Sequence, residues 1–359
     1  MGNQGTKIKI LYLYAELASY PIAIMKELIN EYDAEIIVIS WDENRQTPYK
    51  PPLCEGITYF KKSDFSTSTL IEFSINLNPD MIYISGWMDK MYIKVCRRMK
   101  KIGVPIVAGC DTQWRGSFRQ YVASLISSWY QHRFINYIWV AGVRQYEYAK
   151  KLGFNDKNIL FNCYSADIKL FDQAYLKSLD YKRKRYPRTL IFVGRFHEDK
   201  GIRLLIDAYK ELRAEQGMQW QLVLIGNGGL YKELTEISVE GIQIKDFMQP
   251  ELLVQIVGTA GVFILPSLFE QWGVVIHEFA AGGLPLITSD CCGASTEFLI
   301  PGYNGFLFEN GNKEALKTAI LRLTSLSEEE LLKYGSRSNM LSKKISPQTS
   351  AAFLVSILK

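Results

Sequence analysis

Two glutamates, Glu270 and Glu278, stand eight residues apart in a run where a strand, a turn and a helix are expected to follow one another. A carboxylate in the turn could hold sugar hydroxyls, and one within the helix could accept hydrogen bonds from a ribose. Because the turn falls at the carboxyl edge of a parallel strand, amide groups at the helix start would attract a phosphate. The run therefore indicates a sugar-nucleotide site. Taken alone, Glu270 could equally be a charged loop residue and Glu278 a solvated helix residue.

Two cations precede these glutamates in the chain. Arg195 follows a short apolar run and a glycine, and Lys200 stands just before a helix-forming stretch. A guanidinium can hold phosphate oxygens in a forked geometry, and an ammonium adds a mobile point charge. The alternative is that both cations pair with Glu198 and Asp199 at the surface. Together with the glutamate run, the cations favour a phosphate-binding site.

The elements that must position these residues follow from an alternation of short apolar runs and amphipathic stretches, which is typical of parallel sheets built from β-α-β units. The strands predicted for a first domain are 8–14, 35–40, 57–60, 81–85, 105–108, 137–140 and 159–162. The helices predicted between them are 17–31, 70–77, 90–101, 116–130 and 144–152.

The alternation restarts at residue 190. Residues 165–187 carry the basic run 182–185 and end at Pro187, so they are predicted to be a solvated linker. Further strands are predicted at 190–193, 221–225, 242–246, 262–265 and 286–289. Further helices are predicted at 202–215, 230–237, 251–257, 274–281, 313–323, 328–340 and 347–358. We therefore expect an α/β protein of two doubly wound, Rossmann-like domains, 1–164 and 188–344, facing a central cleft.

Composition is that of an ordinary globular protein. The 359 residues are 48% hydrophobic and 22% charged, with a formal net charge of +5. This charge suits an anionic ligand or membrane surface, but it is too weak and dispersed to indicate nucleic acid. The six cysteines show no C-x-x-C spacing, so reduced thiols in the cytoplasm are expected. Residues 8–14 are too short to cross a bilayer and are predicted to be a strand, not a signal peptide.

The ordered motifs of the second domain resemble the donor-binding domain of retaining glycosyltransferases of family 4, which have the GT-B fold. They are a G-R-x-x-x-x-K-G stretch at 194–201, a glycine turn at 225–228, E-x-x-G followed by E-F-A-A-G-G-L-P at 270–285, and the segments 293–297 and 302–307. The match spans about residues 190–308, in order and with natural spacing.

This resemblance implies roles for the matching residues. Arg195 and Lys200 would hold the donor diphosphate and stabilise charge on the leaving nucleotide. Glu270 would bind hydroxyls of the donor sugar, and Glu278 would bind the ribose. Further donor contacts are implied at Gly194, Gly226, Asn227, Phe247, Met248, Gly273 and Val274. The resemblance also implies a UDP-sugar in preference to a GDP-sugar, no metal or other cofactor, and a last helix, about 345–359, that returns to the first domain.

The first domain departs from the family pattern. The turn after its first strand lacks the usual Gly-Gly, and no histidine stands at the place usually found beside the reacting sugar. Asp111 is predicted to take that place, contacting a donor hydroxyl or orienting the acceptor; alternatively, it is the N-cap of the next helix. Glu16, Trp114 and Arg115 are expected on the acceptor side.

The segment after Asp111 is basic and aromatic. From Trp114 to Val143 there is no acidic residue, while arginines and aromatic residues recur. Such a surface could lie on anionic lipid headgroups, or its aromatic residues could form the core of the first domain.

The sequence thus predicts a metal-independent, retaining, hexosyl-type glycosyltransferase. It would move a sugar from a nucleotide-diphosphate sugar to a saccharide or lipid-linked acceptor in surface polysaccharide biosynthesis. The expected location is the cytoplasm, with peripheral contact at the inner face of the cell membrane. The alternatives are a nucleotide-sugar epimerase of the same fold and a non-catalytic sugar-nucleotide binding protein. A nicotinamide dehydrogenase is disfavoured because no G-x-G-x-x-G follows the first strand.

Overall fold

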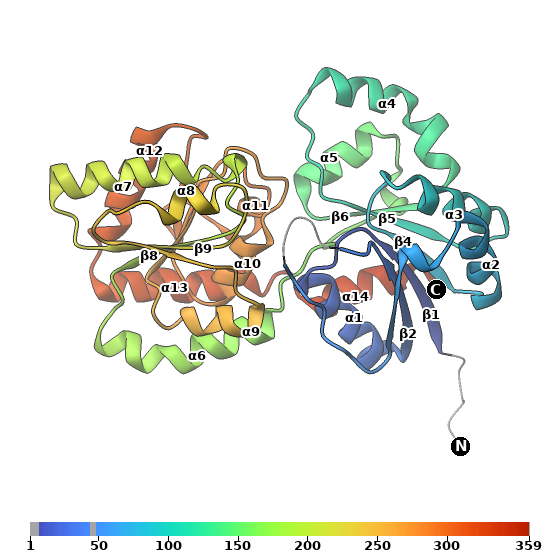
Figure 1. Ribbon diagram of the computed structural model, residues 1–359, viewed down its shortest axis with the longest axis horizontal. Coiled ribbons are helices and arrows are strands. Elements are labelled where there is room, and N and C mark those ends of the chain that lie inside the picture. Colours follow the sequence, from blue (N-terminus) through green and yellow to red (C-terminus); the bar gives the residue numbers. More distant parts are fainter. Residues whose placement is uncertain (1–6, 44–47, 359) are drawn as a thin grey trace. The chain divides into compact units, whose positions relative to one another are not determined.

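A computed structural model describes residues 7–43 and 48–358 (Figure 1). Contacts within the chain divide these residues into two compact units. The first unit contains residues 7–43, 49–165 and 347–358, and the second contains residue 48 and residues 166–346. Both are α/β units with parallel sheets, as the sequence predicts.

The first unit is built on a seven-stranded parallel sheet in the order β3-β2-β1-β4-β5-β6-β7. Its strands are β1 Ile8–Tyr14, β2 Ala34–Ser40, β3 Ile57–Lys61, β4 Met81–Ile84, β5 Ile106–Cys110, β6 Tyr137–Val140 and β7 Ile159–Leu160. Its helices are α1 Ser19–Tyr32, α2 Thr67–Leu77, α3 Lys90–Lys101, α4 Phe118–Tyr130, α5 Val143–Lys151 and α14 Pro347–Val355. The strand order reverses between β1 and β4, which is where open α/β sheets place ligands.

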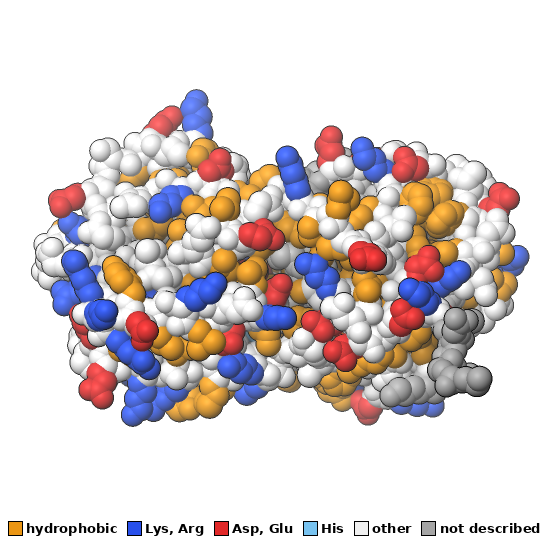
Figure 2. Space-filling view, turned by 90° about the horizontal axis from the view of Figure 1, so that it is seen from below, with side chains coloured by type: hydrophobic (Ala, Val, Ile, Leu, Met, Phe, Trp, Pro, Cys, Tyr) orange, Lys and Arg blue, Asp and Glu red, His pale blue; other side chains and the backbone are white. Residues whose placement is uncertain are grey.

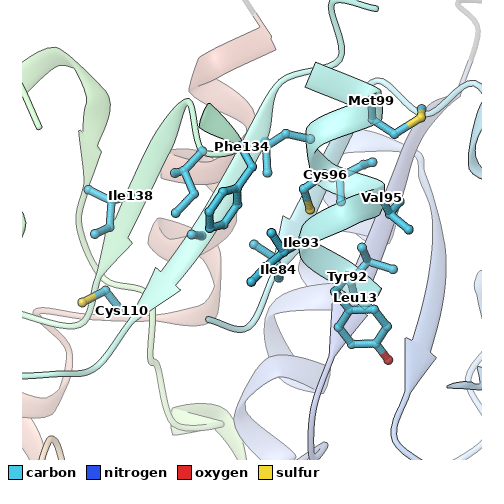
Figure 3. Close-up of a cluster of buried hydrophobic side chains, with 14 of the residues drawn as sticks. Leu13, Ile84, Tyr92, Ile93, Val95, Cys96, Met99, Cys110, Phe134 and Ile138 are labelled. Carbon is cyan, nitrogen blue, oxygen red and sulfur yellow. The ribbon is translucent and has the colours of Figure 1, made fainter. Parts of the chain in front are cut away.

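The apolar face of α3 covers one side of this sheet. Figure 3 shows Tyr92, Ile93, Val95, Cys96 and Met99 of α3 together with other members of the same buried cluster, which are Leu13, Ile84, Cys110, Phe134 and Ile138. A large apolar side chain that leaves water in this way contributes about 1.5–3 kcal/mol. The last helix, α14, packs against α1 in the same unit.

The second unit has a six-stranded parallel sheet in the order β10-β9-β8-β11-β12-β13. Its strands are β8 Thr189–Val193, β9 Gln221–Ile225, β10 Ile242–Lys245, β11 Val262–Leu265, β12 Leu286–Ser289 and β13 Gly305–Phe308. Its helices are α6 Ile168–Lys184, α7 Ile202–Gln216, α8 Tyr231–Thr235, α9 Pro250–Leu253, α10 Val274–Ala281, α11 Ser295–Phe298, α12 Lys313–Thr324 and α13 Glu328–Ser342. Phe263 of β11 stacks on Phe279 of α10 with ring centroids 4.7 Å apart, which seats α10 on the sheet.

The prediction of a solvated linker over 165–187 is wrong, because most of this segment is α6, a 17-residue helix of the second unit. The side chain of Asp167 accepts the N–H of Leu170 and caps its start. Side chains buried on one face recur at helical spacing, at Phe171, Tyr175, Ser178 and Lys182. Most of the basic run is therefore the last turn of an amphipathic helix, in which Lys182 is buried. The exposed cations Arg183 and Lys184 of this turn interact favourably with the helix dipole.

Charged side chains of both signs are interspersed on the face drawn in Figure 2, as the low net charge predicts. In the part of the chain that the structure describes, no helix is long and apolar enough to cross a membrane.

Candidate functional site

Two loops meet at the carboxyl edge of the second sheet, after the neighbouring strands β8 and β11. The carbonyl oxygen of Asp199 accepts hydrogen bonds from the N–H groups of Leu268 at 2.7 Å and Phe269 at 3.0 Å. Gly201 has a φ of +64°, and a Cβ atom there would lie 2.0 Å from the carbonyl oxygen of Pro266. The lack of a side chain at Gly201 lets the two loops touch, so the residues on them are held in fixed register.

Lys200 and Glu270 form an ion pair across this junction. Their Nζ and Oε2 atoms are 2.5 Å apart, and each side chain is only 12% exposed. The alternative in which Lys200 pairs with Glu198 or Asp199 at the surface is wrong, since its ammonium faces Glu270 and Glu198 binds Arg203 instead. Glu270 is therefore a sheltered, oriented carboxylate rather than a solvated loop charge.

Arg195 lies at the end of β8, beside the glycine turn that follows the adjacent strand β9. A Cβ atom at Gly226 would lie 1.9 Å from the carbonyl oxygen of Gly194, and one at Gly228 would lie 2.6 Å from that of Phe196. Only glycine fits these two positions. The Arg195 side chain is half-buried and makes no hydrogen bond or ion pair within residues 7–43 and 48–358. A sheltered cation without an anionic partner is suited to bind an anionic ligand.

Asn227 joins the same turn to the end of β10. Its Nδ2 donates to Oδ1 of Asp246 at 2.8 Å, and the N–H of Phe247 donates to the same oxygen at 2.7 Å. These bonds lower the pKa of Asp246, which keeps the carboxylate ionised at neutral pH. Phe247 and Met248 are half-buried beside it. The turns after β9 and β10 thus form one connected rim.

A left-handed glycine starts α10 immediately after the ion pair. Gly273 has a φ of +90°, and a Cβ atom there would lie 3.2 Å from Cγ of Glu270. Val274 is the first residue of α10, where N–H groups have no partners within the helix and attract anions. Gly273 therefore brings a helix start next to Glu270.

Glu278 lies further along α10 and is partly buried. Burial, with a smaller contribution from the charge of Asp167, raises the pKa of Glu278 to about 7. No hydrogen bond to its carboxylate is found among the residues described. The neighbouring His277 is fully buried and bonded through both ring nitrogens, and burial lowers its pKa to about 4. Glu278 is thus not a solvated helix residue, whereas His277 is structural.

Sequence reasoning missed a polar cluster close to Glu270, formed where the ends of β11 and β12 lead into their loops. The carbonyl oxygen of Ser267 accepts hydrogen bonds from Ser289 Oγ at 2.6 Å and Cys291 Sγ at 3.1 Å. Burial, a hydrogen bond with Cys291 and the charge of Glu270 raise the pKa of Cys292 well above its usual value, so this thiol stays neutral. The available signal was the cysteine pair that follows a strand of the same sheet after one intervening residue.

In the first unit, Asp111 follows β5 and is not an N-cap. The next helix, α4, begins at Phe118, and the side chain of Ser117 caps it by accepting the N–H of Gln120. Asp111 is half-buried. Burial, and next the charge of Asp111, raises the pKa of Tyr164 well above its usual value, which places the carboxylate close to a buried tyrosine.

A cavity of about 220 Å³ lies at this edge of the first sheet. Its lining includes Ala15, Trp41, Trp87, Asp89, Asp111 and Tyr148. The Asp89 carboxylate is held by Lys62 at 2.5 Å and by the indole N–H of Trp41 at 2.8 Å. Glu16 follows the lining residue Ala15 and is half-buried. Aromatic walls with a few fixed polar groups are typical of small-molecule sites.

Trp114 and Arg115 do not line this cavity. Trp114 stacks on Tyr148 at 6.1 Å and meets Tyr121 edge-on at 4.9 Å, so it packs between α4 and α5. Arg115 is exposed, and its N–H donates to Oε1 of Gln120 at 2.8 Å.

Comparison with known proteins supports the resemblance in the second unit. Residues 187–325 match the family described as glycosyl transferases group 1. The uncharacterized glycosyltransferase MJ1178 of Methanocaldococcus jannaschii is 33% identical over 161 residues, which is 44% of this chain and 43% of that protein. The amylovoran biosynthesis glycosyltransferase AmsK of Erwinia amylovora is 29% identical over 149 residues, 38% of this chain and 36% of that protein. Each match spans less than half of the relative.

Solved structures are similar over nearly the whole chain. Anabaena HepE in complex with UDP-glucose has a TM-score of 0.72 at 16% identity and covers 98% of this chain and 99% of its own. A glycosyltransferase from Rickettsia africae has a TM-score of 0.70 at 14% identity and covers 99% and 98%. These likenesses confirm the predicted GT-B fold of two Rossmann-like domains.

Proposed function

We propose that the protein transfers a hexosyl-type sugar from a UDP-sugar to a saccharide or lipid-linked acceptor, because residues 187–325 match the family described as glycosyl transferases group 1. The observation that carries this proposal is the arrangement of charges in the second unit. The Lys200–Glu270 pair is sheltered at 12% exposure of each side chain. Arg195 and Glu278 supply a cation and a carboxylate that the described residues leave unpaired.

The donor diphosphate is proposed to lie against Arg195 and Lys200. When the bond between the anomeric carbon and the phosphate oxygen breaks, negative charge develops on the departing diphosphate. Fixed cations in a sheltered site stabilise that charge strongly, because no solvent has to reorganise around it. The start of α10, beside Gly273 and Val274, adds partial positive charge. We propose that these groups suffice without a metal ion.

Glu270 and Glu278 are proposed to orient the donor. Lys200 fixes the Glu270 carboxylate, and carboxylate oxygens can accept hydrogen bonds from the hydroxyls of a donor sugar. Glu278, with its pKa raised to about 7, is partly protonated at neutral pH. Ribose hydroxyls that donate to it would favour the ionised form, so donor binding is expected to release a proton from Glu278.

Retention is proposed to follow from attack on the face that the nucleotide leaves. The acceptor oxygen bonds to the anomeric carbon as the bond to phosphate breaks, and the departing phosphate oxygen takes the acceptor's proton. The cavity of the first unit, with Asp111 in its wall, is proposed to hold the acceptor. Support for the donor class comes from the UDP-glucose complex of HepE. The name of AmsK supports a role in polysaccharide biosynthesis.

A panel of nucleotide sugars tests the proposal. A UDP-sugar should raise the melting temperature of the protein, and Lys200→Met should abolish the rise, whereas the control Arg203→Met, in an exposed ion-pair network, should keep it. The stabilising donor should then be consumed with an acceptor saccharide in the presence of a metal chelator. Conversion of the donor into its epimer without acceptor would identify an epimerase instead. Binding without turnover across a panel of acceptors would identify a sugar-nucleotide binding protein.

A further inference from the structure

Helix α4 presents its apolar face to solvent. The large apolar residues on this helix recur at the spacing of one helical stripe, and we call them the α4 stripe: Phe118, Tyr121, Val122, Leu125, Ile126 and Trp129. Their side chains are 40–83% exposed. In a helix that packs on its own domain, such a stripe faces the core. The orientation of α4 is therefore the reverse of the usual one.

The opposite face of α4 attaches it to the first unit through small and polar side chains. Ser127 is fully buried. Gln120 donates to the carbonyl oxygen of Gln113 at 2.6 Å and accepts from the N–H of Arg115 at 2.8 Å. Packing of aromatic residues in the core was the alternative for this segment, and it holds for Phe134, which is fully buried. It does not hold for the α4 stripe.

The segment that carries the stripe is positively charged. Residues 114–143 include three arginines, Arg115, Arg119 and Arg133, and no acidic residue. All three are exposed, and the Arg133 guanidinium lies 4.2 Å from the ring centre of Trp129. The basic end of α3 lies next to the chain that leaves α4, because Lys100 donates to the carbonyl oxygens of His132 at 2.8 Å and Ile135 at 2.6 Å. The exposed apolar stripe is thus accompanied by exposed cations of the same segment.

We propose that α4 docks the protein on a membrane surface rich in anionic lipid. The helix of 13 residues would lie in the headgroup plane with its stripe among the upper acyl carbons and its arginines at lipid phosphates. The arginines of this segment favour an anionic lipid surface over a second copy of the same cationic segment, which would be repelled. This inference does not depend on glycosyl transfer.

Vesicle sedimentation with the full-length protein tests the docking surface. Wild-type protein should sediment with phosphatidylglycerol-containing vesicles and at least about tenfold less with pure phosphatidylcholine, because each arginine near an anionic surface adds attraction. Leu125→Glu combined with Trp129→Glu should weaken binding to the anionic vesicles by at least about tenfold. The matched control is Leu176→Glu on α6, where the side chain is 58% exposed, and it should bind like wild type.

Two further measurements keep the inference refutable. Anionic vesicles should shift the tryptophan emission of wild type to shorter wavelength, and Trp129→Phe should remove most of that shift. Equal vesicle binding by wild type and the double variant would overturn the proposal. So would concentration-dependent self-association of wild type without lipid that the double variant lacks, because the stripe would then be a contact between copies. The assay contains no donor, so its failure leaves the proposed transfer reaction untouched.

Discussion

The Lys200–Glu270 pair allows stability and turnover to be separated by three variants, Lys200→Met, Glu270→Gln and the two combined. At the 2.5 Å separation, two unit charges attract by roughly 7 kcal/mol at an effective dielectric constant of about 20. Most of this attraction offsets the cost of removing both charges from water. The pair is therefore expected to add little net stability, although removing one partner leaves a sheltered charge uncompensated.

Each single variant should lower the free energy of unfolding by about 2–4 kcal/mol, slightly below the value for fully buried pairs because solvent reaches part of the site. The melting temperature of the second unit should fall by roughly 5–10 °C. The double variant should lose no more than about 1 kcal/mol, since no charge is left unpaired. Thermal melts at constant pH measure all three, with the exposed Arg203→Met as the control.

The transfer rates of the three variants should not parallel their stabilities. All three variants should transfer sugar at least about a hundredfold more slowly than wild type, because each lacks a charge that meets the donor in the transition state. Steady-state rates with a saturating donor provide the measurement. Recovery of wild-type turnover by the stable double variant would refute the reasoning, since the pair would then only hold two loops together. Wild-type rates in both single variants would place the site elsewhere.

Three other residues give separate predictions. Since burial and then Asp167 raise the pKa of Glu278 to about 7, the folded protein holds a proton that the unfolded chain releases above about pH 4.3. Stability should therefore fall as pH rises towards 7, and Glu278→Gln should remove this slope and add about 1–3 kcal/mol at pH 8 in urea titrations. Burial lowers the pKa of Lys182 to about 7, so the unfolded chain binds more protons and stability should rise between about pH 7 and 10. Lys182→Met should flatten that rise in pH-dependent melts and stabilise the protein at pH 7 by about 1–4 kcal/mol. Gly226→Ala would place a Cβ atom 1.9 Å from a carbonyl oxygen, whereas Gly229→Ala would meet nothing within 4 Å. The first should cost at least about 2 kcal/mol and the second under about 1 kcal/mol, so equal melting temperatures would contradict the close approach.

The order of strands and helices was predictable because each rests on a local pattern. The predicted strands of both units and the turns at Gly226 and Gly273 stand where the sequence predicts them, whereas the edge strand β13 was not predicted. The linker over 165–187 was predicted wrongly because the basic run 182–185 outweighed the helical spacing of the apolar residues before it. Lys182 is the first residue of that run. Its burial depends on packing in the second unit, which its neighbours in the sequence do not reveal.

The N-cap interpretation of Asp111 failed for a related reason. Several loop residues separate Asp111 from α4, and the cap is Ser117. Capping preferences are alike for aspartate and serine, so the sequence alone did not choose between them. Similarly, an amphipathic pattern over 118–130 predicts a helix but not which of its faces meets the protein.

The sequence by itself determined the two α/β domains, the ordered motifs that we propose bind phosphate and the set of residues that could do the chemistry, because spacing and glycine turns act within a few residues of chain. The tertiary structure decided which of these residues meet. Lys200 faces Glu270 across 70 residues of chain, and burial by distant segments moves the pKa of Glu278 to about 7. It also left the α4 stripe exposed. Contact and desolvation depend on segments far apart in sequence, and no local pattern records them.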